Sequence, residues 1–399
     1  MGLNDTVSAE RVHIGFFGIR NAGKSSVVNA VTSQQLSVVS DVKGTTTDPV
    51  KKAMELLPIG PVLIIDTPGI DDEGDLGEKR VEKTLEILNK TDVAVLVVDG
   101  VIGKTNVDNE LISTFEKRQI PYIVVYNKSD IVMTDLKVGE NEIYVSAKTG
   151  KGITELKEKL GALSKQKENK KTIVADLLGK GDIVVLCIPI DESAPKGRLI
   201  LPQQLTIRDI LDNNCACVCC QPSELKSIIE VLSQNVKMVI TDSQVFNEVS
   251  KIVPDDILLT SFSILMARYK GDLTSLVNGA SKLKKIKSGD KILISEGCTH
   301  HRQCNDIGSV KIPNWIRKYT GAEPEFEFTS GGEFPRNLER YSLIVHCGGC
   351  MLNEKEMKRR LNEAEIQNIP MVNYGVLIAQ VNGILKRSLQ VFPQYKDSI

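Results

Sequence analysis

Short apolar runs alternate with longer polar segments over the first 165 residues of the chain. The runs are VHIGFF (12–17), PVLIID (61–66), DVAVLVVD (92–99), YIVVYN (122–127) and EIYVS (142–146). The segments between them, such as EKRVEKTLEILNK, repeat apolar residues with the period of a helix. Strands that alternate with helices form a mostly parallel sheet, so the pattern predicts a doubly wound α/β domain over residues 1–165.

Two further units follow the polar, lysine-rich stretch SKQKENKK, which we interpret as a linker. In the first unit, IVVLCIPI and KMVITDSQ are typical of strands, and LTIRDILDNN is typical of a helix. In the second, the apolar runs KILISEG, YSLIVHCGG and PMVNYGVL each lead into a glycine-bearing loop. The pattern therefore predicts a small α/β domain over residues 172–256 and a C-terminal α/β domain over residues 257–399.

Composition limits the class of protein and its partners. A chain of 399 residues exceeds one ordinary core and agrees with about two or three domains. The net charge of −1 gives no reason to expect nucleic acid or an anionic membrane as a partner. No run of about 18 apolar residues and no signal peptide is visible, so we expect a cytoplasmic protein. In that reducing compartment the nine cysteines are expected to bind metal or to be buried rather than to form disulfides.

The stretch GIRNAGKS (18–25) matches the phosphate-binding pattern G-x-x-x-x-G-K-[ST], and it lies between an expected strand and an expected helix. The glycines allow the backbone N–H groups to surround phosphates, Lys24 reaches the β and γ phosphates, and the Ser25 hydroxyl is placed for Mg²⁺. The candidate phosphate-binding residues are Gly18, Asn21, Ala22, Gly23, Lys24, Ser25 and Ser26.

Two later segments complete the expected catalytic set. In GTTTD (44–48), Thr46 is the candidate for binding Mg²⁺ and the γ phosphate. In DTPG (66–69), Asp66 is expected to hold Mg²⁺ through its outer shell, and the Gly69 N–H is expected to sense the γ phosphate. Together with Lys24, these are the candidate catalytic residues.

Selection of guanine is expected from NKSD (127–130) and SAK (146–148). A carboxylate at Asp130 can accept hydrogen bonds from N1 and N2 of guanine, and adenine lacks this pair of donors. We expect Asn127 to support the base near O6, the stem of Lys128 to cover the ring, and a backbone N–H of the SAK segment to reach O6. The SAK residues are Ser146, Ala147 and Lys148. These five elements, in this order, resemble the GTP-binding proteins of the translation-factor class.

Two details of this domain bear on the rate of hydrolysis. Ile70 follows DTPG where signalling GTPases place a glutamine that orients water, so hydrolysis is expected to be slow or to be complemented by another group. Asn21 and the GTTTD segment resemble the potassium-activated GTPases, in which the asparagine holds K⁺. The alternative, which stays open, is that Asn21 is a loop residue that tolerates left-handed backbone geometry.

Cysteines cluster in the last two units. Cys187 lies in an apolar strand and is expected to be a core residue, and burial is also the preferred interpretation of CACVCC (215–220). CTHHRQC (298–304) and HCGGC (346–350) differ, because each follows an expected strand of one parallel sheet, whose carboxyl ends meet at a single crevice. The C-x-x-C spacing allows two thiolates to bind one metal centre, and thiolates select zinc, copper(I) or iron–sulfur. Zinc bound by Cys298, His300, Cys347 and Cys350 is one candidate.

The pattern C-x-H … H-C-x-x-C resembles the signature of the HydF family, the GTPases that mature FeFe-hydrogenase. GRLILPQQLTIRDILD and VITDSQVF resemble the middle domain of that family, so the resemblance covers essentially the full chain. It implies a middle domain that forms a homodimer and a C-terminal domain that binds a 4Fe–4S cluster. It also implies a scaffold on which the two-iron subcluster is assembled with two radical-SAM maturases and then delivered to FeFe-hydrogenase apoprotein.

Carried over by position, the resemblance implies Cys298, Cys347 and Cys350 as cluster ligands. We expect a fourth ligand that exchanges more readily than a thiolate, and the candidates are His346, His300 and Glu296. Closure of an ordinary four-cysteine site by Cys304 is the alternative. The competing function is a translation- or RNA-modification-type GTPase whose C-terminal domain is stabilised by zinc.

Overall fold

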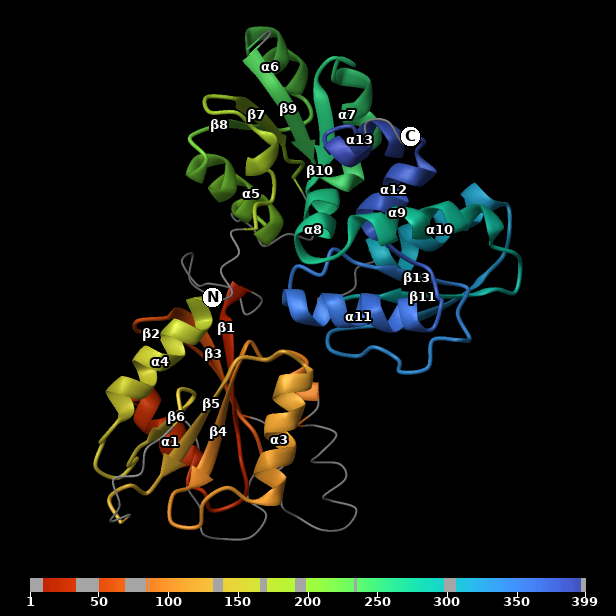
Figure 1. Ribbon diagram of the computed structural model, residues 1–399. Coiled ribbons are helices and arrows are strands. Elements are labelled where there is room, and N and C mark those ends of the chain that lie inside the picture. The colour runs from red at the N-terminus through yellow and green to blue at the C-terminus, as the bar shows by residue number, and fades with distance from the viewer. Residues whose placement is uncertain are drawn as a thin grey trace. The chain divides into compact units, whose positions relative to one another are not determined.

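In the computed structural model (Figure 1), the described residues are 10–33, 50–68, 84, 86–131, 139–165, 171–190, 199–232, 235–297 and 306–395. The chain divides near residue 170 into two compact units. None of the helices in the described part of the chain has both the length and the apolar character that a membrane crossing needs.

The first unit is built on a six-stranded sheet with the strand order β2-β3-β1-β4-β5-β6. The bounds are β1 Val12–Phe17, β2 Val50–Leu56, β3 Gly60–Asp66, β4 Val93–Asp99, β5 Tyr122–Asn127 and β6 Glu142–Tyr144. Only the pair of β2 with β3 is antiparallel. The predicted doubly wound, mostly parallel sheet is confirmed.

Helices cover both faces of this sheet. They include α1 (Lys24–Thr32), α3 (Asn106–Lys117) and α4 (Ile153–Lys165). Val95 of β4 belongs to one apolar cluster with α1 and α4, and the next residue, Leu96, belongs to a second cluster with Phe115 of α3. Successive residues of a strand point to opposite faces, so β4 is apolar throughout because both of its faces are buried.

The second unit contains two four-stranded sheets, with the orders β10-β9-β7-β8 and β12-β11-β13-β14, and every neighbouring pair of strands is parallel. The bounds are β7 Ile183–Cys187, β8 Ala216–Cys220, β9 Val236–Thr241, β10 Leu258–Ser261, β11 Lys291–Ser295, β12 Glu325–Thr329, β13 Leu343–His346 and β14 Met371–Asn373. The helices are α5 Leu201–Asp212, α6 Leu225–Leu232, α7 Phe246–Ile252, α8 Phe262–Lys270, α9 Leu273–Ser281, α10 Ile312–Thr320, α11 Glu354–Ile366, α12 Tyr374–Val381 and α13 Leu385–Leu389.

One continuous apolar core joins these two sheets. It contains Val185 and Ile240 from the first sheet, Leu293 and Val345 from the second, and Leu265 of α8 between them. Strand β10 lies beyond residue 256, where we placed the end of the middle domain, yet it pairs with β9. The sheet of the middle domain therefore extends to Ser261, and α8 follows it directly.

Helix α9 packs closely on β14 because Gly279 has no side chain. A Cβ atom at this position would overlap with the backbone carbonyl of Met371, and neither backbone can yield without moving the helix or the strand. The close packing of α9 supports β14, which pairs with β13, the strand that leads to the HCGGC loop.

Gly279→Ala is therefore expected to lower the free energy of unfolding by about 2 kcal/mol, because the added methyl group forces two backbones apart. Asn278→Ala changes an exposed side chain of the same helix and serves as the control. Urea unfolding followed by circular dichroism measures both. Equal stability of the two variants would contradict the proposed backbone overlap.

Candidate functional site

The phosphate-binding loop folds as its sequence predicts. Gly18, Asn21 and Gly23 have φ of +146°, +61° and +83°. A Cβ atom at Gly18 would overlap with the carbonyl of Val97, and one at Gly23 would overlap with the Asn127 amide, so both positions need glycine. Asn21 adopts the left-handed geometry that one of the two interpretations of this residue requires. The loop ends where α1 begins, and the N-terminus of a helix favours phosphate.

Ser25 and Asp66 come together beside this loop. The Ser25 hydroxyl donates a 2.9 Å hydrogen bond to Asp66 Oδ2. The other carboxylate oxygen, Asp66 Oδ1, is buried and has no hydrogen-bond partner among the described residues. Oxygen ligands of this kind suit Mg²⁺, so the pair fits the predicted magnesium site. Thr46, Gly69 and Ile70 lie outside the described residues.

Asn127 links the phosphate loop to the SAK segment. Its side-chain nitrogen donates to the Ala22 carbonyl at 3.1 Å, and its oxygen accepts from the Ala147 N–H at 3.1 Å. The side chain is buried. It therefore fixes the distance between the phosphate-binding and base-binding segments.

Asp130 is exposed, and its carboxylate accepts a 2.7 Å hydrogen bond from the buried hydroxyl of Ser146. This hydrogen bond lowers the pKa of Asp130, so the carboxylate is charged and oriented before a base arrives. Lys148, two residues after Ser146, is exposed. The arrangement brings NKSD and SAK together as predicted.

Sequence reasoning missed the partner of Lys128. Its ammonium lies 2.5 Å from Asp99 Oδ2, at the end of β4, and the residue has φ of +67°. Burial acts to raise the pKa of Asp99, but its hydrogen bonds, first that from Lys128, hold the pKa below its usual value. The position of Asp99 at the carboxyl end of a buried strand next to β5 was the available signal.

In the C-terminal domain, neighbouring strands β11 and β13 bring the two cysteine segments together. The Gly297 N–H donates to Cys347 Sγ at 3.0 Å, and the Gly349 N–H donates to the same sulfur at 3.3 Å. Cys298 directly follows Gly297 but lies outside the described residues, as do His300 and Cys304. The predicted meeting of the two strand ends is thus present at Cys347.

The environment of Cys347 and Cys350 suits a thiolate-bound metal centre. Burial raises the pKa of Cys347 to about 11, and the two backbone N–H groups oppose this rise. Burial also raises the pKa of Cys350, and the Lys270 ammonium opposes it. N–H groups that point at a sulfur stabilise the thiolate once a metal replaces the proton. A cluster or a zinc ion fits this donor set, although the described residues alone hold no group of three metal-ligating side chains.

Glu296 lies at the end of β11, beside Cys347. It is buried, and its Oε1 accepts a 3.2 Å hydrogen bond from the hydroxyl of Tyr374. A Cβ atom at Gly308 would overlap with the same oxygen. The negative charge of Glu296 contributes to the raised pKa of Cys347, so the two groups interact.

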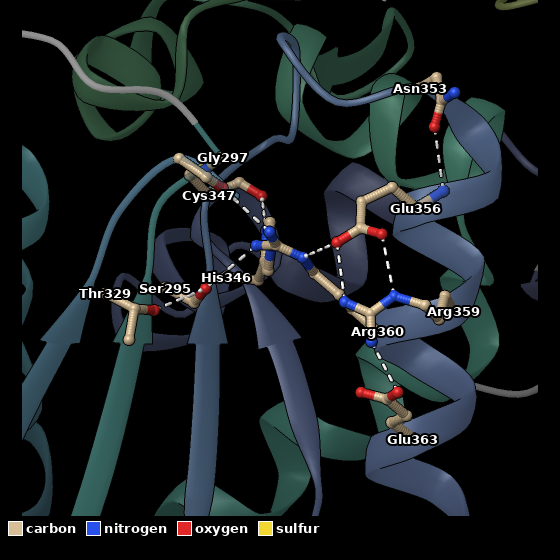
Figure 2. Close-up of polar contacts among 11 residues, drawn as sticks. Ser295, Gly297, Thr329, His346, Cys347, Asn353, Glu356, Arg359, Arg360 and Glu363 are labelled. Atoms are coloured by element: carbon tan, nitrogen blue, oxygen red, sulfur yellow. Dashed lines mark hydrogen bonds and ion pairs between the residues drawn. The ribbon is translucent and has the colours of Figure 1, made fainter. Parts of the chain in front are cut away.

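The ring of His346 lies between the Cys347 carbonyl and Arg360 (Figure 2). Its Nδ1 lies 2.7 Å from the Cys347 carbonyl and its Nε2 lies 3.0 Å from Nη1 of Arg360. Arg360 can only donate, so Nε2 accepts and Nδ1 donates, and the ring is neutral. Burial, and then the charge of Arg360, lowers the pKa of His346 to about 4. A ligand role for His346 would break one of these hydrogen bonds.

The partner of His346 is a buried ionic network that the sequence did not reveal (Figure 2). Arg360 is fully buried and donates to Glu356, to Ser295 Oγ at 3.3 Å and to the Gly331 carbonyl at 2.9 Å. Glu356 also pairs with Arg359. The sequence EKEMKRRLNEAE shows opposite charges at i, i+3 and i, i+4 spacing. This pattern does not indicate which of its two arginines is buried.

The CACVCC run forms the edge strand β8 from Ala216 onward, and Cys220 pairs in register with the buried Cys187 of β7. Burial was expected for the whole run and is only partly present. Cys215 is buried, Cys217 and Cys220 are half-buried, and Cys219 is exposed.

Comparison with protein-family models matches three parts of the chain. Residues 173–271 match the hydrogen maturase F dimerisation domain, and residues 274–391 match the hydrogen maturase F tetramerisation domain. Residues 13–128 match the 50S ribosome-binding GTPase model. The two hydrogen maturase F models together match more than half of the chain.

The chain belongs to the hydrogen maturase F family. Its N-terminal domain makes it a GTP-hydrolysing enzyme of that family. The family models also support association into oligomers through the last two domains. The first of these two models ends at residue 271 and the second begins at residue 274, so the boundary between them lies after α8.

Curated GTPases match about a third of the chain. The tRNA modification GTPase MnmE of Legionella pneumophila (strain Corby) is 37% identical over 145 residues, which cover 35% of this chain and 32% of that protein. GTPase Der of Wolinella succinogenes is 37% identical over 165 residues, which cover 37% and 35%. The match thus spans about a third of each relative.

Two solved structures resemble part of the chain. A probable GTP-binding protein engB is 24% identical with a TM-score of 0.32, covering 39% of this chain and 100% of that one. The G domain of T. maritima FeoB is 21% identical with a TM-score of 0.31, covering 39% and 99%.

Asp130→Asn is expected to weaken GTP binding at least about 100-fold, because the negative charge is lost and one acceptor oxygen is replaced by an N–H donor that faces a donor of guanine. The same variant should gain affinity for xanthosine nucleotides, which present an acceptor at the 2-position. Asp212→Asn, an exposed aspartate of α5, is the control. Titration with fluorescent nucleotides measures both, and equal affinity of the native protein for ATP and GTP would contradict guanine selection.

Proposed function

We propose that this chain is a GTP-hydrolysing scaffold that binds a 4Fe–4S cluster, assembles the two-iron subcluster and delivers it to FeFe-hydrogenase apoprotein. Two radical-SAM maturases would act with it on the same scaffold. The observation that carries the proposal is the pair of N–H groups, from Gly297 and Gly349, that converge on Cys347 Sγ from two neighbouring strand ends. The family membership supports the same function.

Cys298, Cys347 and Cys350 would hold the cluster, and Glu296 is the described candidate for the fourth, exchangeable position. Glu296 is preferred to His346 because its charge acts on the Cys347 thiol, whereas both ring nitrogens of His346 are engaged in hydrogen bonds. The cluster would supply an iron atom with a replaceable ligand. The chain's own contribution is to orient the sulfur atoms with backbone N–H groups and to exclude water from Cys347.

In the GTPase domain, Lys24, Ser25 and Asp66 would bind the phosphates and Mg²⁺, and Thr46 and Gly69 would respond to the γ phosphate. Ser26 and Lys148 would complete the nucleotide contacts. Hydrolysis should be slow without a further group, because Ile70 cannot orient water. K⁺ held by Asn21 would supply the missing positive charge.

A zinc site at the same cysteines is the chemical alternative, and metal analysis separates the two. Anaerobically purified protein should be brown and should contain iron and sulfide. Colourless protein with stoichiometric zinc would contradict the cluster and would favour a zinc-stabilised GTPase.

Single cysteine-to-alanine variants test the ligand set. Cys298→Ala, Cys347→Ala and Cys350→Ala are expected to lose most of the iron after anaerobic reconstitution, because a two-thiolate site binds a cluster weakly. Cys304→Ala should keep its iron, as should Cys219→Ala, a control at the exposed cysteine of β8. Glu296→Gln should keep iron but change the electron paramagnetic resonance spectrum of the reduced cluster. Iron loss in Cys304→Ala equal to that of the other three would overturn the three-cysteine site.

Potassium dependence tests the role of Asn21. GTP turnover is expected to be at least about tenfold faster in K⁺ than in Na⁺ at equal ionic strength, because a cation near the γ phosphate acts like an arginine finger. Asn21→Ala should remove the difference between the two salts. Identical rates of the native protein in the two salts would exclude K⁺ as an activator.

A further inference from the structure

A buried lysine, Lys270, holds the turn that carries Cys350. It is the last residue of α8 and is only 2% exposed. Its ammonium donates to the carbonyl of Cys350 at 3.1 Å and to the carbonyl of Leu352 at 3.0 Å. These two acceptors lie on either side of Met351, so one ammonium fixes the end of the HCGGC turn.

Helix α8 also approaches the start of the same turn. Ser263, in its first turn, accepts a 3.0 Å hydrogen bond at its carbonyl from the Asn373 side chain, and it lies next to Gly348 and Gly375. Ser263 and Lys270 are seven residues apart, or about 10 Å along a helix axis. The helix therefore extends past the cysteine turn and contacts it near Gly348 and again at Cys350.

Burial of the Lys270 ammonium requires compensating groups around it. A charge removed from water is destabilising unless hydrogen bonds or opposite charges compensate. Backbone carbonyls provide hydrogen bonds, and thiolates at Cys347 and Cys350 would provide negative charge when a cluster is bound. Lysine at the C-terminus of a helix is also favoured by the helix dipole.

We propose that Lys270 is a positioning residue for the cluster site, which orients the Cys350 turn and places a fixed positive charge beside the cluster, so that the cluster is easier to reduce. The inference rests on the proposed cluster-binding function. Helix α8 belongs to the segment that the dimerisation-domain model matches. The proposal gives this helix a direct role at the metal site. A buried cation stabilises the more negative, reduced form of a cluster, and both the charge and the hydrogen bonds around the sulfur atoms set its potential.

The test compares Lys270→Met and Lys270→Gln with Lys251→Met in the full chain. Methionine keeps the apolar stem of the side chain and removes its charge and donors, and glutamine keeps a donor without the charge. Lys251 is an exposed lysine of α7, so its variant controls for the loss of one charge. Iron and sulfide content are measured first, and the midpoint potential of the reconstituted cluster is then measured by redox titration.

Both Lys270 variants are expected to lower the ratio of reduced to oxidised cluster about tenfold at a fixed applied potential, which is a shift of about 59 mV for one electron. The control should keep the wild-type potential. Variants with full cluster content and an unchanged potential would overturn the electrostatic role.

Hydrogen exchange of the metal-free protein provides a second measurement that needs no cluster. Lys270→Met is expected to speed exchange of the amides at residues 348–353, because the turn loses its two hydrogen bonds to the ammonium, and Lys251→Met should not. Unchanged exchange would overturn the positioning role. If the native protein holds no cluster at all, the proposed function fails on the metal analysis, whereas this exchange experiment still decides whether Lys270 fixes the turn.

Discussion

The C-terminal site depends on one buried guanidinium. Ser295 and His346 are partners in register at the ends of β11 and β13, and Nη1 of Arg360 lies within hydrogen-bond distance of both. Breaking a buried ion pair costs about 3–5 kcal/mol, because the remaining charge is left without compensation. Glu356 compensates Arg360 from the preceding turn of α11. The two strand ends, which lead to Gly297 and Cys347, are therefore tied to one helix.

The parts of the structure that could be predicted from sequence are those with local causes. Buried parallel strands such as β4 show as continuous apolar runs, and the phosphate loop requires glycine at fixed spacings whatever surrounds it. Strands β2, β10 and β12 were not predicted. Each lies at the edge of its sheet, and β2 and β12 are half-exposed, so their composition carries little of the apolar signal.

The side chains that hold the metal site were beyond prediction for a different reason. Lys270 and Cys350 are 80 residues apart, and Arg360 and His346 are 14 apart, so their pairing depends on how α8 and α11 pack on the sheet. Charged residues on helices are usually solvated, and the sequence does not show that Lys270 and Arg360 are buried instead. His346 shows the consequence: its place in the signature suggested a ligand, whereas its Nδ1 bonds to the Cys347 carbonyl and its Nε2 accepts from Arg360.

The two family domains of the second unit are not separate modules around this site. Helix α8 continues directly from β10 of the first sheet, yet its Ser263 carbonyl is bound by Asn373, the N-cap of α12 in the second sheet. The apolar core is likewise continuous through Leu265. The start of α8 is thus held by both sheets within one close-packed interior. Through Lys270, the same helix also reaches the Cys350 turn, so the first sheet and the cysteine turn are joined by one element of the fold.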